Sequence, residues 1–312
     1  MSSTTIAQPV AQTPASLNGH RLRLLTGYGA AVALIVFLAI YGADYYTLDE
    51  TLRPYSPKHA LLKPSGVIGI KLGILGLGMF CVIFLYPLRK RWKWLSQQGL
   101  TKHWMDYHVL LGLAAPFVIA FHASFKFRGL AGTAFWIMSA VALSGVIGRY
   151  LYSQIPRRVT AAELSFKEAR DLQEKYTAQL SSQRLFRESY LRSLFSVPTE
   201  EQVARMPIVV MLAYMVALDL LRPWRIARLR RRTLTKWQSV NSLGGLLRTT
   251  NIELEQAVDI ARAQAALSKR LTFFSRVQKA FHLWHVVHRP FSYTFAVLAI
   301  IHIAVVWVLG YI

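Results

Sequence analysis

The chain has 312 residues, is 54% hydrophobic and carries a formal net charge of +22. This combination excludes an ordinary soluble domain and is typical of a multi-spanning membrane protein with its basic parts on one side. The basic residues flank apolar runs or lie in one intervening segment, so we expect anionic membrane lipid, and no nucleic acid, as their partner. The single cysteine, Cys81, leaves no pair for a disulfide within the chain.

Taken in order, the chain begins with a stretch rich in Ser, Thr, Ala and Pro, which predicts a disordered tail over 1–20. Five apolar runs follow that are each long enough to cross a bilayer, at 24–46, 65–87, 104–125, 130–152 and 284–311. The first run is too long for a signal-peptide core, so we expect it to be retained. These runs divide the chain into membrane helices 1–4 over 21–152 and a fifth over 284–312.

A strongly basic insert, 153–283, separates the fourth run from the fifth. Mixed charges at helical spacing predict a helix over 161–182, and a second helix is expected over 251–269. The apolar run 207–221 is shorter than a membrane span. We interpret it as a helix that lies on, or dips into, the inner leaflet, and the alternative of a sixth span stays open.

Basic residues also predict the orientation of the chain. They precede the first run, fill the link 88–103 and dominate the insert, whereas the links 47–64 and 126–129 are less basic or short. The positive-inside rule therefore places the N-terminus and the insert in the cytoplasm and the C-terminus outside. We expect a multi-pass protein of the cell inner (cytoplasmic) membrane.

The third and fifth runs share a histidine pattern. His108 and His122 are fourteen residues apart, and so are His288 and His302. Fourteen residues fall about 40° short of four full helical turns and rise about 21 Å, so each pair lies on one face with one imidazole towards each side of the membrane. The predicted orientation makes the two helices parallel, which places His108 level with His288 and His122 level with His302.

Other histidines fit this pattern less well. His285 and His103 fall about 100° from the shared faces, and His282 falls about 160° away. We interpret these three as residues at the cytoplasmic edge. His20 and His59 lie outside the five runs and are given no role.

Two level pairs of imidazoles predict two bis-histidine haem sites, with His108, His122, His288 and His302 as axial ligands of the haem irons. Ionisable groups inside a span are costly and usually functional. No CxxCH motif is present, so the haem would be held noncovalently. Gly69 and Gly73 form a GxxxG pattern that either packs helices closely or leaves room for a flat cofactor. Five cationic residues are candidates for pairing with the haem propionates, although snorkelling to the lipid headgroups is the favoured account of each. They are Lys71, Lys126, Arg128, Arg149 and Arg289.

The segments YHVLLGLAAPFVIAFHASFKF, SGVIGRYLYSQIPR and WHVVHRPFSYTFAVLAIIH resemble the di-haem b-type membrane cytochromes, which include the cytochrome b and ferric-reductase-like four-helix cores. The resemblance covers the third to fifth runs, and its specific part is the histidine spacing. It implies two haem b groups and transmembrane electron transfer. In one respect it departs from the ferric-reductase pattern, since we expect no flavin- and nicotinamide-binding domain after the last run.

The sequence therefore predicts an all-α membrane protein of five transmembrane helices, with a four-helix haem-binding bundle and a helical basic cytoplasmic insert. The expected function is electron transfer between a quinol or reductase partner and an acceptor across the bilayer, as a subunit of a membrane oxidoreductase. Two alternatives remain open. The first is a noncatalytic scaffold that recruits partners through its insert. The second is a transporter that uses its histidines for protons or metal.

Overall fold

The computed structural model describes residues 14–155, 171, 197–231, 242–249 and 251–311. Within these ranges the regular structure is entirely helical. Five helical segments are long and apolar enough to cross a membrane: Gly19–Tyr41, His59–Arg89, Thr101–His122, Gly129–Gln154 and Ile252–Val308. The predicted fold class, an all-α protein with five membrane-spanning helices, is confirmed.

The chain forms two compact units. Unit 1 comprises Met1–Arg149 and Val286–Ile312, and unit 2 comprises Tyr150–His285. Helix α13, Ile252–Val308, contributes its first part to unit 2 and its last part to unit 1. It continues through residue 283, where the sequence predicted the end of the insert, and through Pro290.

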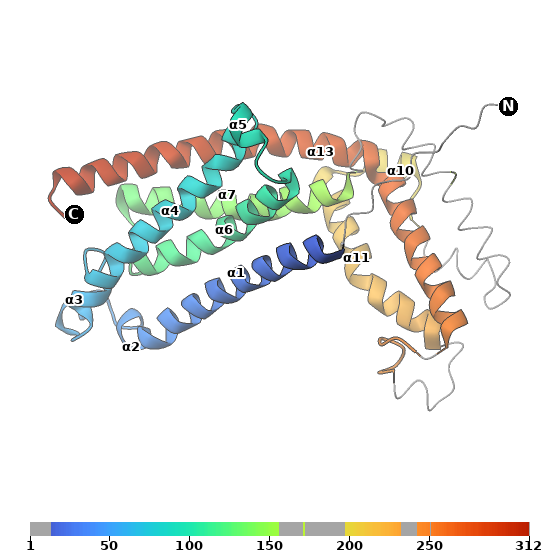
Figure 1. Cartoon of the computed structure of the whole chain (residues 1–312), viewed down its shortest axis with the longest axis horizontal. Helices are drawn as coiled ribbons and strands as arrows, with labels where there is room; N and C mark the ends of the chain where they lie inside the picture. The colour runs from blue at the N-terminus through green and yellow to red at the C-terminus, as the bar shows by residue number, and fades with distance from the viewer. Residues whose placement is uncertain (1–13, 156–170, 172–196, 232–241, 250, 312) are drawn as a thin grey trace. The chain divides into compact units, whose positions relative to one another are not determined.

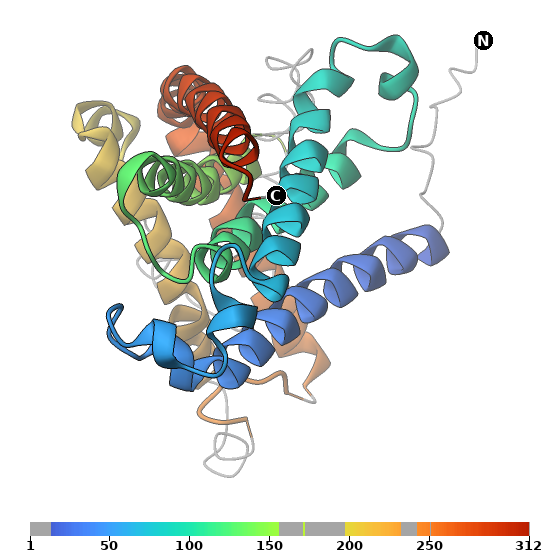
Figure 2. The same cartoon turned by 90° about the vertical axis from the view of Figure 1, so that its left-hand side faces the viewer.

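Unit 1 is built from long helices that alternate in direction. Helices α1 (Pro14–Tyr41), α6 (Thr101–His122) and the last part of α13 run one way in Figure 1. Helices α4 (Val67–Arg89) and α7 (Gly129–Gln154) run the other way. Figures 1 and 2 show α4 beside α6, with α1 also packed against α6. The parallel arrangement of the two histidine-bearing segments is therefore present in unit 1.

The connections on either side of α4 are made of short helices. The link from α1 to α4 contains α2 (Ala43–Tyr46), the 3-10 helix η1 (Arg53–Tyr55) and α3 (His59–Leu62). The link from α4 to α6 contains α5 (Lys93–Ser96). Arg89 ties that second link by donating hydrogen bonds to the hydroxyl of Thr101 and to the carbonyls of Ser96 and Gly99.

The core of unit 1 lies where α1, α4 and α6 meet. Leu38 of α1 packs with Leu72 and Met79 of α4 and with Val118 and Phe121 of α6, all of them buried. Small residues allow α4 and α6 to approach closely, as is common for helices in lipid. A Cβ at Gly76, for example, would lie 2.3 Å from a methyl carbon of Ile119.

Two predicted boundaries in unit 1 are corrected. Helix α1 already begins at Pro14, so the disordered tail predicted over 1–20 is wrong for 14–20, and residues 1–13 lie outside the described part of the chain. Helix α6 ends at His122 instead of residue 125 because Ser124 and Phe125 adopt positive φ angles. Ser124 is buried there, donating a hydrogen bond to the Leu62 carbonyl and accepting one from Arg53.

Unit 2 contains α10 (Glu200–Arg205), α11 (Ile208–Arg231) and the first part of α13. Thr199 and Gln202 form a capping box that starts α10. The core joins Leu151, Met211, Met215, Phe273 and Val277. The helix predicted over 251–269 is confirmed by α13, and the one predicted over 161–182 lies outside the described residues except for residue 171.

Helix α11 has 24 residues and is therefore longer than the helix predicted over 207–221. The additional residues include the arginines that follow the apolar run, between 222 and 231. It is not one of the five helices apolar enough to span a membrane. Asp219 in its middle accepts hydrogen bonds from buried Lys269 at 2.6 Å and from Tyr150 at 2.9 Å, which ties α11 to α13 and to the end of α7 within unit 2.

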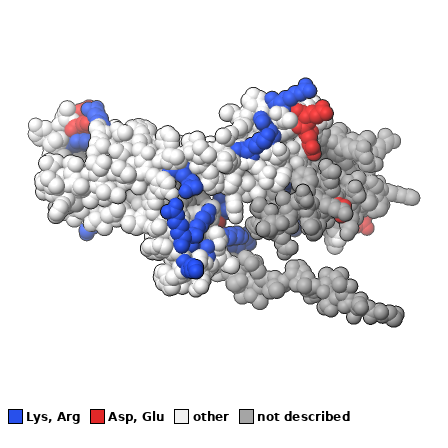
Figure 3. Space-filling model, turned by 90° about the horizontal axis from the view of Figure 1, so that it is seen from above, with Lys and Arg blue, Asp and Glu red and all other residues white. Residues whose placement is uncertain are grey.

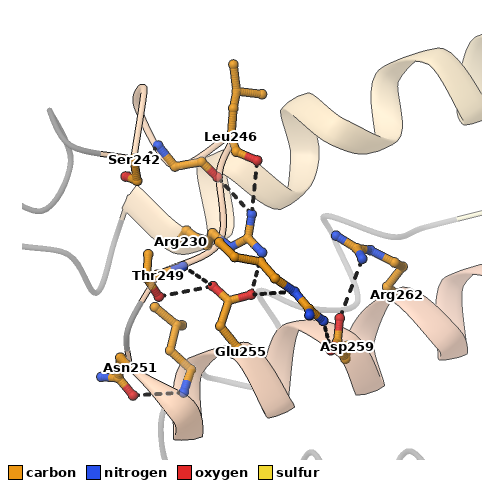
Figure 4. Close-up of polar contacts among 11 residues, drawn as sticks. Arg230, Ser242, Leu246, Thr249, Asn251, Glu255, Asp259 and Arg262 are labelled. Carbon is orange, nitrogen blue, oxygen red and sulfur yellow. Dashed lines mark hydrogen bonds and ion pairs between the residues drawn. The ribbon is translucent and has the colours of Figure 1, made fainter.

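A second polar network joins α11 to the start of α13 (Figure 4). The Arg230 side chain, 2% exposed, donates to Glu255 at 2.5 Å and to the carbonyls of Gly245 and Leu246. Glu255 also accepts hydrogen bonds from the backbone and hydroxyl of Thr249. The guanidinium therefore fixes the turn between the two helices as well as their packing.

Removing Arg230 is expected to destabilise unit 2 strongly. The variant Arg230→Ala removes the buried cation closest to the Glu255 carboxylate, which is only 12% exposed, and breaking such a pair costs about 3–5 kcal/mol. The matched control is Arg248→Ala, because Arg248 contacts Glu255 and Asp259 from an exposed position, with 70% of its side chain accessible. Its removal should cost at most about 1 kcal/mol. Hydrogen exchange of the amides in 251–262 measures both effects, and equal protection in the two variants would contradict the prediction.

Candidate functional site

All four predicted histidine ligands belong to unit 1. His108 and His122 lie on α6, and His288 and His302 lie on α13. Each side chain is partly buried. Helices α4 and α7 supply the neighbouring groups that position these rings, so four helices contribute to the site.

His122 is held against α4. Its Nδ1 atom lies 2.8 Å from the Gly69 carbonyl oxygen. Gly73, one turn further along α4, faces the ring so closely that a Cβ there would lie 2.8 Å from the His122 Cε1 atom. The GxxxG pattern of α4 therefore makes room for an imidazole: Gly69 supplies a hydrogen-bond acceptor, and Gly73 supplies space.

His108 has an equivalent position at the other end of α6. Its Nδ1 atom lies 3.2 Å from the Ile83 carbonyl oxygen, and the Tyr86 ring lies 5.3 Å from its own ring. Gly69 and Ile83 are fourteen residues apart on α4, as are His122 and His108 on α6. Two antiparallel helices in constant register therefore give both imidazoles the same kind of backbone acceptor.

His288 is positioned by α7. Its Nδ1 atom lies 2.7 Å from the Ser144 Oγ atom, and that hydroxyl donates its own proton to the Val141 carbonyl at 2.8 Å. The oxygen is therefore the acceptor, and the His288 Nδ1 atom carries the hydrogen. Gly145 also adjoins this ring, since a Cβ there would lie 3.9 Å from the Cε1 atom.

His302 lies on the last part of α13, and the sequence prediction pairs it with His122. Also in unit 1, Phe80 of α4 and Phe295 of α13 pack with ring centroids 4.6 Å apart. This ring contact joins α13 to α4.

Three of the four rings share one feature that matters chemically. Carbonyl oxygens cannot donate, so the Nδ1 atoms of His108 and His122 must carry the hydrogen, as that of His288 does. In this tautomer the lone pair is on Nε2. An imidazole that donates from Nδ1 to a backbone or side-chain oxygen has its ring oriented and its basicity raised, which is the common arrangement for histidines that ligate metals.

The structure also shows a polar cluster that the sequence did not reveal. His20 of α1, which was given no role, is nearly buried and stacks on His103 with ring centroids 3.6 Å apart. Its Nε2 atom lies 3.1 Å from the Asp106 carboxylate, which accepts a second hydrogen bond from Arg149 at 2.8 Å. The cluster joins α1, α6 and α7. No sequence period relates residue 20 to residue 103, so only the packing of α1 on α6 could identify it.

The histidines that were set aside are placed differently from the four predicted ligands. His282 and His285 belong to unit 2, where His282 is exposed and the His285 Nδ1 atom lies 3.2 Å from the Phe281 carbonyl. Arg149, a candidate partner for a haem propionate, is paired with Asp106 instead. Lys71, Arg128 and Arg289 are exposed.

Within the described ranges, no three His, Cys, Asp or Glu side chains converge in an arrangement that would hold a metal ion directly. A zinc site needs three or four such ligands at one point. The sequence prediction instead assigns its four ligands to two separate levels, two at each. Comparisons of the chain with protein-family models, curated proteins and solved structures find no match.

Proposed function

We propose that this chain is a membrane di-haem b-type cytochrome that carries electrons across the bilayer. His122 and His302 would hold one haem b, and His108 and His288 the other. The donor would be a quinol or a reductase partner, with an acceptor on the opposite side. The observation that carries the proposal is the shared hydrogen bonding of His108, His122 and His288, whose Nδ1 atoms are engaged while the lone pair is on Nε2.

The donor set fits this cofactor. Bis-histidine ligation requires two imidazoles for each haem, and the proposed pairing of the four histidines of unit 1 supplies two for each. Haem supplies one-electron oxidation and reduction when bound, and its potential depends on the axial ligands, burial and nearby hydrogen bonds. The contributions of the protein are therefore the carbonyls of Gly69 and Ile83, the Ser144 hydroxyl and the apolar surroundings that exclude water.

The remaining parts of unit 1 support this assignment. Phe80 and Phe295 pack with their ring centroids 4.6 Å apart and connect α4 with α13. The backbone at Gly73 comes close to His122 without a side chain, which limits how that ring can turn. Both features are expected of a rigid site whose ligands keep their orientation, because reorganisation on changing charge slows electron transfer.

The proposal is tested by a dithionite-reduced minus oxidised spectrum of the purified chain in detergent, with haem quantified as the pyridine haemochrome. Two haem b per chain are expected. A colourless protein would overturn the proposal in favour of a scaffold or a transporter, and a single haem per chain would overturn the two-level pairing.

Ser144→Ala is expected to weaken the site that contains His288. The variant removes the hydrogen-bond acceptor of Nδ1, and the loss of such a partner typically lowers metal affinity about 10–100-fold. The measurement is the rate at which haem passes from the purified protein to excess apomyoglobin. The matched control is Ser292→Ala, because the Ser292 hydroxyl donates to the backbone carbonyl of His288 and leaves the ring untouched. Equal rates in the two variants would contradict the prediction.

A further inference from the structure

Helix α11 has two apolar faces, although a helix on the surface of a compact unit needs only one. Met211, Met215 and Leu218 are buried in the core of unit 2. On the other side, Val209 is 77% exposed and Leu220 is 69% exposed. The buried face accounts for the packing of α11 within unit 2. The packing of unit 2 does not explain why the exposed face is apolar as well.

The exposed side chains form a continuous surface. Positions 209, 213, 216, 220 and 224 recur at intervals of three or four residues, which places them along one side of a helix. All five positions are exposed, and exposed apolar residues at 210, 217 and 221 flank them. We call this the α11 stripe, comprising Val209, Val210, Ala213, Val216, Ala217, Leu220, Leu221 and Trp224.

Basic residues follow the stripe on the same helix. Trp224, at the end of the stripe, is 60% exposed. Arg228 and Arg231 are exposed in the next two turns, and Arg225 is partly exposed beside Trp224. The sequence continues with a further arginine at 232. The apolar surface thus ends in tryptophan and then in positive charge.

This order of groups fits one partner. A helix with an apolar side, an aromatic residue and several arginines lies in the plane of a membrane interface, with its apolar side at the boundary of headgroups and acyl chains. Tryptophan favours that boundary, and arginines near it attract anionic headgroups. The stripe covers 16 residues, or roughly 24 Å of helix, which is shorter than the roughly 30 Å of the hydrocarbon core. It would therefore lie along a leaflet and would not cross it.

We propose that the α11 stripe is a lipid-binding surface that holds unit 2 on a leaflet rich in anionic phospholipid. A bilayer is adjacent to this chain in any case, because five of its helices are suited to cross one. Charge complementarity singles out anionic lipid, because Arg225, Arg228 and Arg231 follow the stripe on the same helix and the chain carries +22 overall. On the face shown in Figure 3, Lys and Arg also gather in clusters, some of them beside Asp and Glu. The inference does not depend on haem.

The test uses the full-length protein in nanodiscs, with an environment-sensitive fluorophore on a single cysteine. In a Cys81→Ser background, the fluorophore is attached to Leu220→Cys in the stripe or to Gln202→Cys, an exposed polar position on α10 of the same unit. Discs contain phosphatidylcholine alone or with phosphatidylglycerol. Each sample is exposed to a shallow nitroxide-labelled lipid and separately to iodide in the water.

The expected result is quenching at position 220 by the lipid nitroxide and protection from iodide, both stronger in discs with phosphatidylglycerol, whereas position 202 shows the reverse. Adding Arg225→Gln, Arg228→Gln and Arg231→Gln should return the label at 220 to the quenching seen in phosphatidylcholine alone. The same circular dichroism spectrum in all variants controls for folding.

Two outcomes would overturn the proposal. Quenching of position 220 by iodide to the same extent as position 202 would show that the stripe faces water. Protection from both quenchers would show that protein covers it, either a second copy or another segment of this chain. Val209→Cys, at the opposite end of the stripe, repeats the measurement if the label at 220 perturbs the helix.

Discussion

His122→Ala and His302→Ala should each remove one haem and leave the other. The proposed function assigns both rings to the same haem iron, so either substitution would deprive that iron of a ligand. Haem per chain should fall by about half in both variants. His108→Ala and His288→Ala should each remove the other haem. The measurement is the pyridine haemochrome together with a redox titration followed by the reduced-minus-oxidised spectrum.

Matched controls are available on the same helix. His282→Ala and His285→Ala change histidines that lie within two turns of His288 but belong to unit 2, and both variants should keep their full haem content. Haem loss in these controls, or unchanged haem in either His122→Ala or His302→Ala, would refute the pairing. A redox titration distinguishes specific loss from general unfolding, because the surviving haem should keep its own potential.

Gly73→Leu should have the second large effect. Even a Cβ alone at this position would lie 2.8 Å from the His122 Cε1 atom, so a leucine side chain must displace the ring or separate α4 from α6. Overpacking of this kind costs about 1–3 kcal/mol. We expect a lower thermal midpoint and loss of the haem assigned to His122, with the other haem retained. Thermal unfolding followed by circular dichroism, together with haem quantification, measures both.

Gly78→Leu is the matched control, because it makes the same change on the same helix. A Cβ at Gly78 meets no atom within 4 Å, and Gly78 is exposed. Leucine favours the helix over glycine by about 1 kcal/mol, so this variant should be as stable as the parent or slightly more so. A Gly73→Leu protein with an unchanged melting temperature and both haems would show that the contact with His122 has no role in the site.

The structure gives the GxxxG pattern of α4 a more specific interpretation than its sequence does. Small residues at this spacing are common wherever membrane helices approach each other. Here the Gly69 carbonyl accepts the hydrogen bond from His122, and Gly73 contacts the same ring. The sequence left helix packing and space for a cofactor as equal alternatives. The geometry shows that both glycines contribute to the position of one imidazole, Gly69 through its carbonyl and Gly73 through the space beside the ring.

The polar cluster at His20 has a structural consequence for unit 1. Asp106 accepts hydrogen bonds from side chains of two other helices, α1 and α7, and its own side chain is only 10% exposed. The sequence treated His20 as part of a tail and treated Arg149 as a possible partner for a cofactor. Burial of a carboxylate requires compensation by donors, and the fold satisfies that requirement by bringing together residues 86 and 43 positions away in the chain.

Local patterns were sufficient for the helices themselves. Apolar runs of about twenty residues predict spanning helices because the backbone must satisfy its own hydrogen bonds in lipid, and five such helices are present in the described residues. Helix ends were less predictable. Helix α6 stops at His122, and Ser124 just beyond it is hydrogen-bonded to Leu62 and Arg53, residues from the link between α1 and α4. The early start of α1 at Pro14 was also missed, since the sequence there has the composition of a tail.

The sequence by itself determined the all-helical membrane architecture and the spacing of His108, His122, His288 and His302, because hydrophobic length and the helical period are properties of neighbouring residues. Only the tertiary structure decided which atoms those rings contact. The acceptors at Gly69, Ile83 and Ser144, and the space at Gly73, come from other helices whose register depends on side-chain packing. For the same reason the α11 stripe became visible only when the core of unit 2 had accounted for the opposite face of that helix.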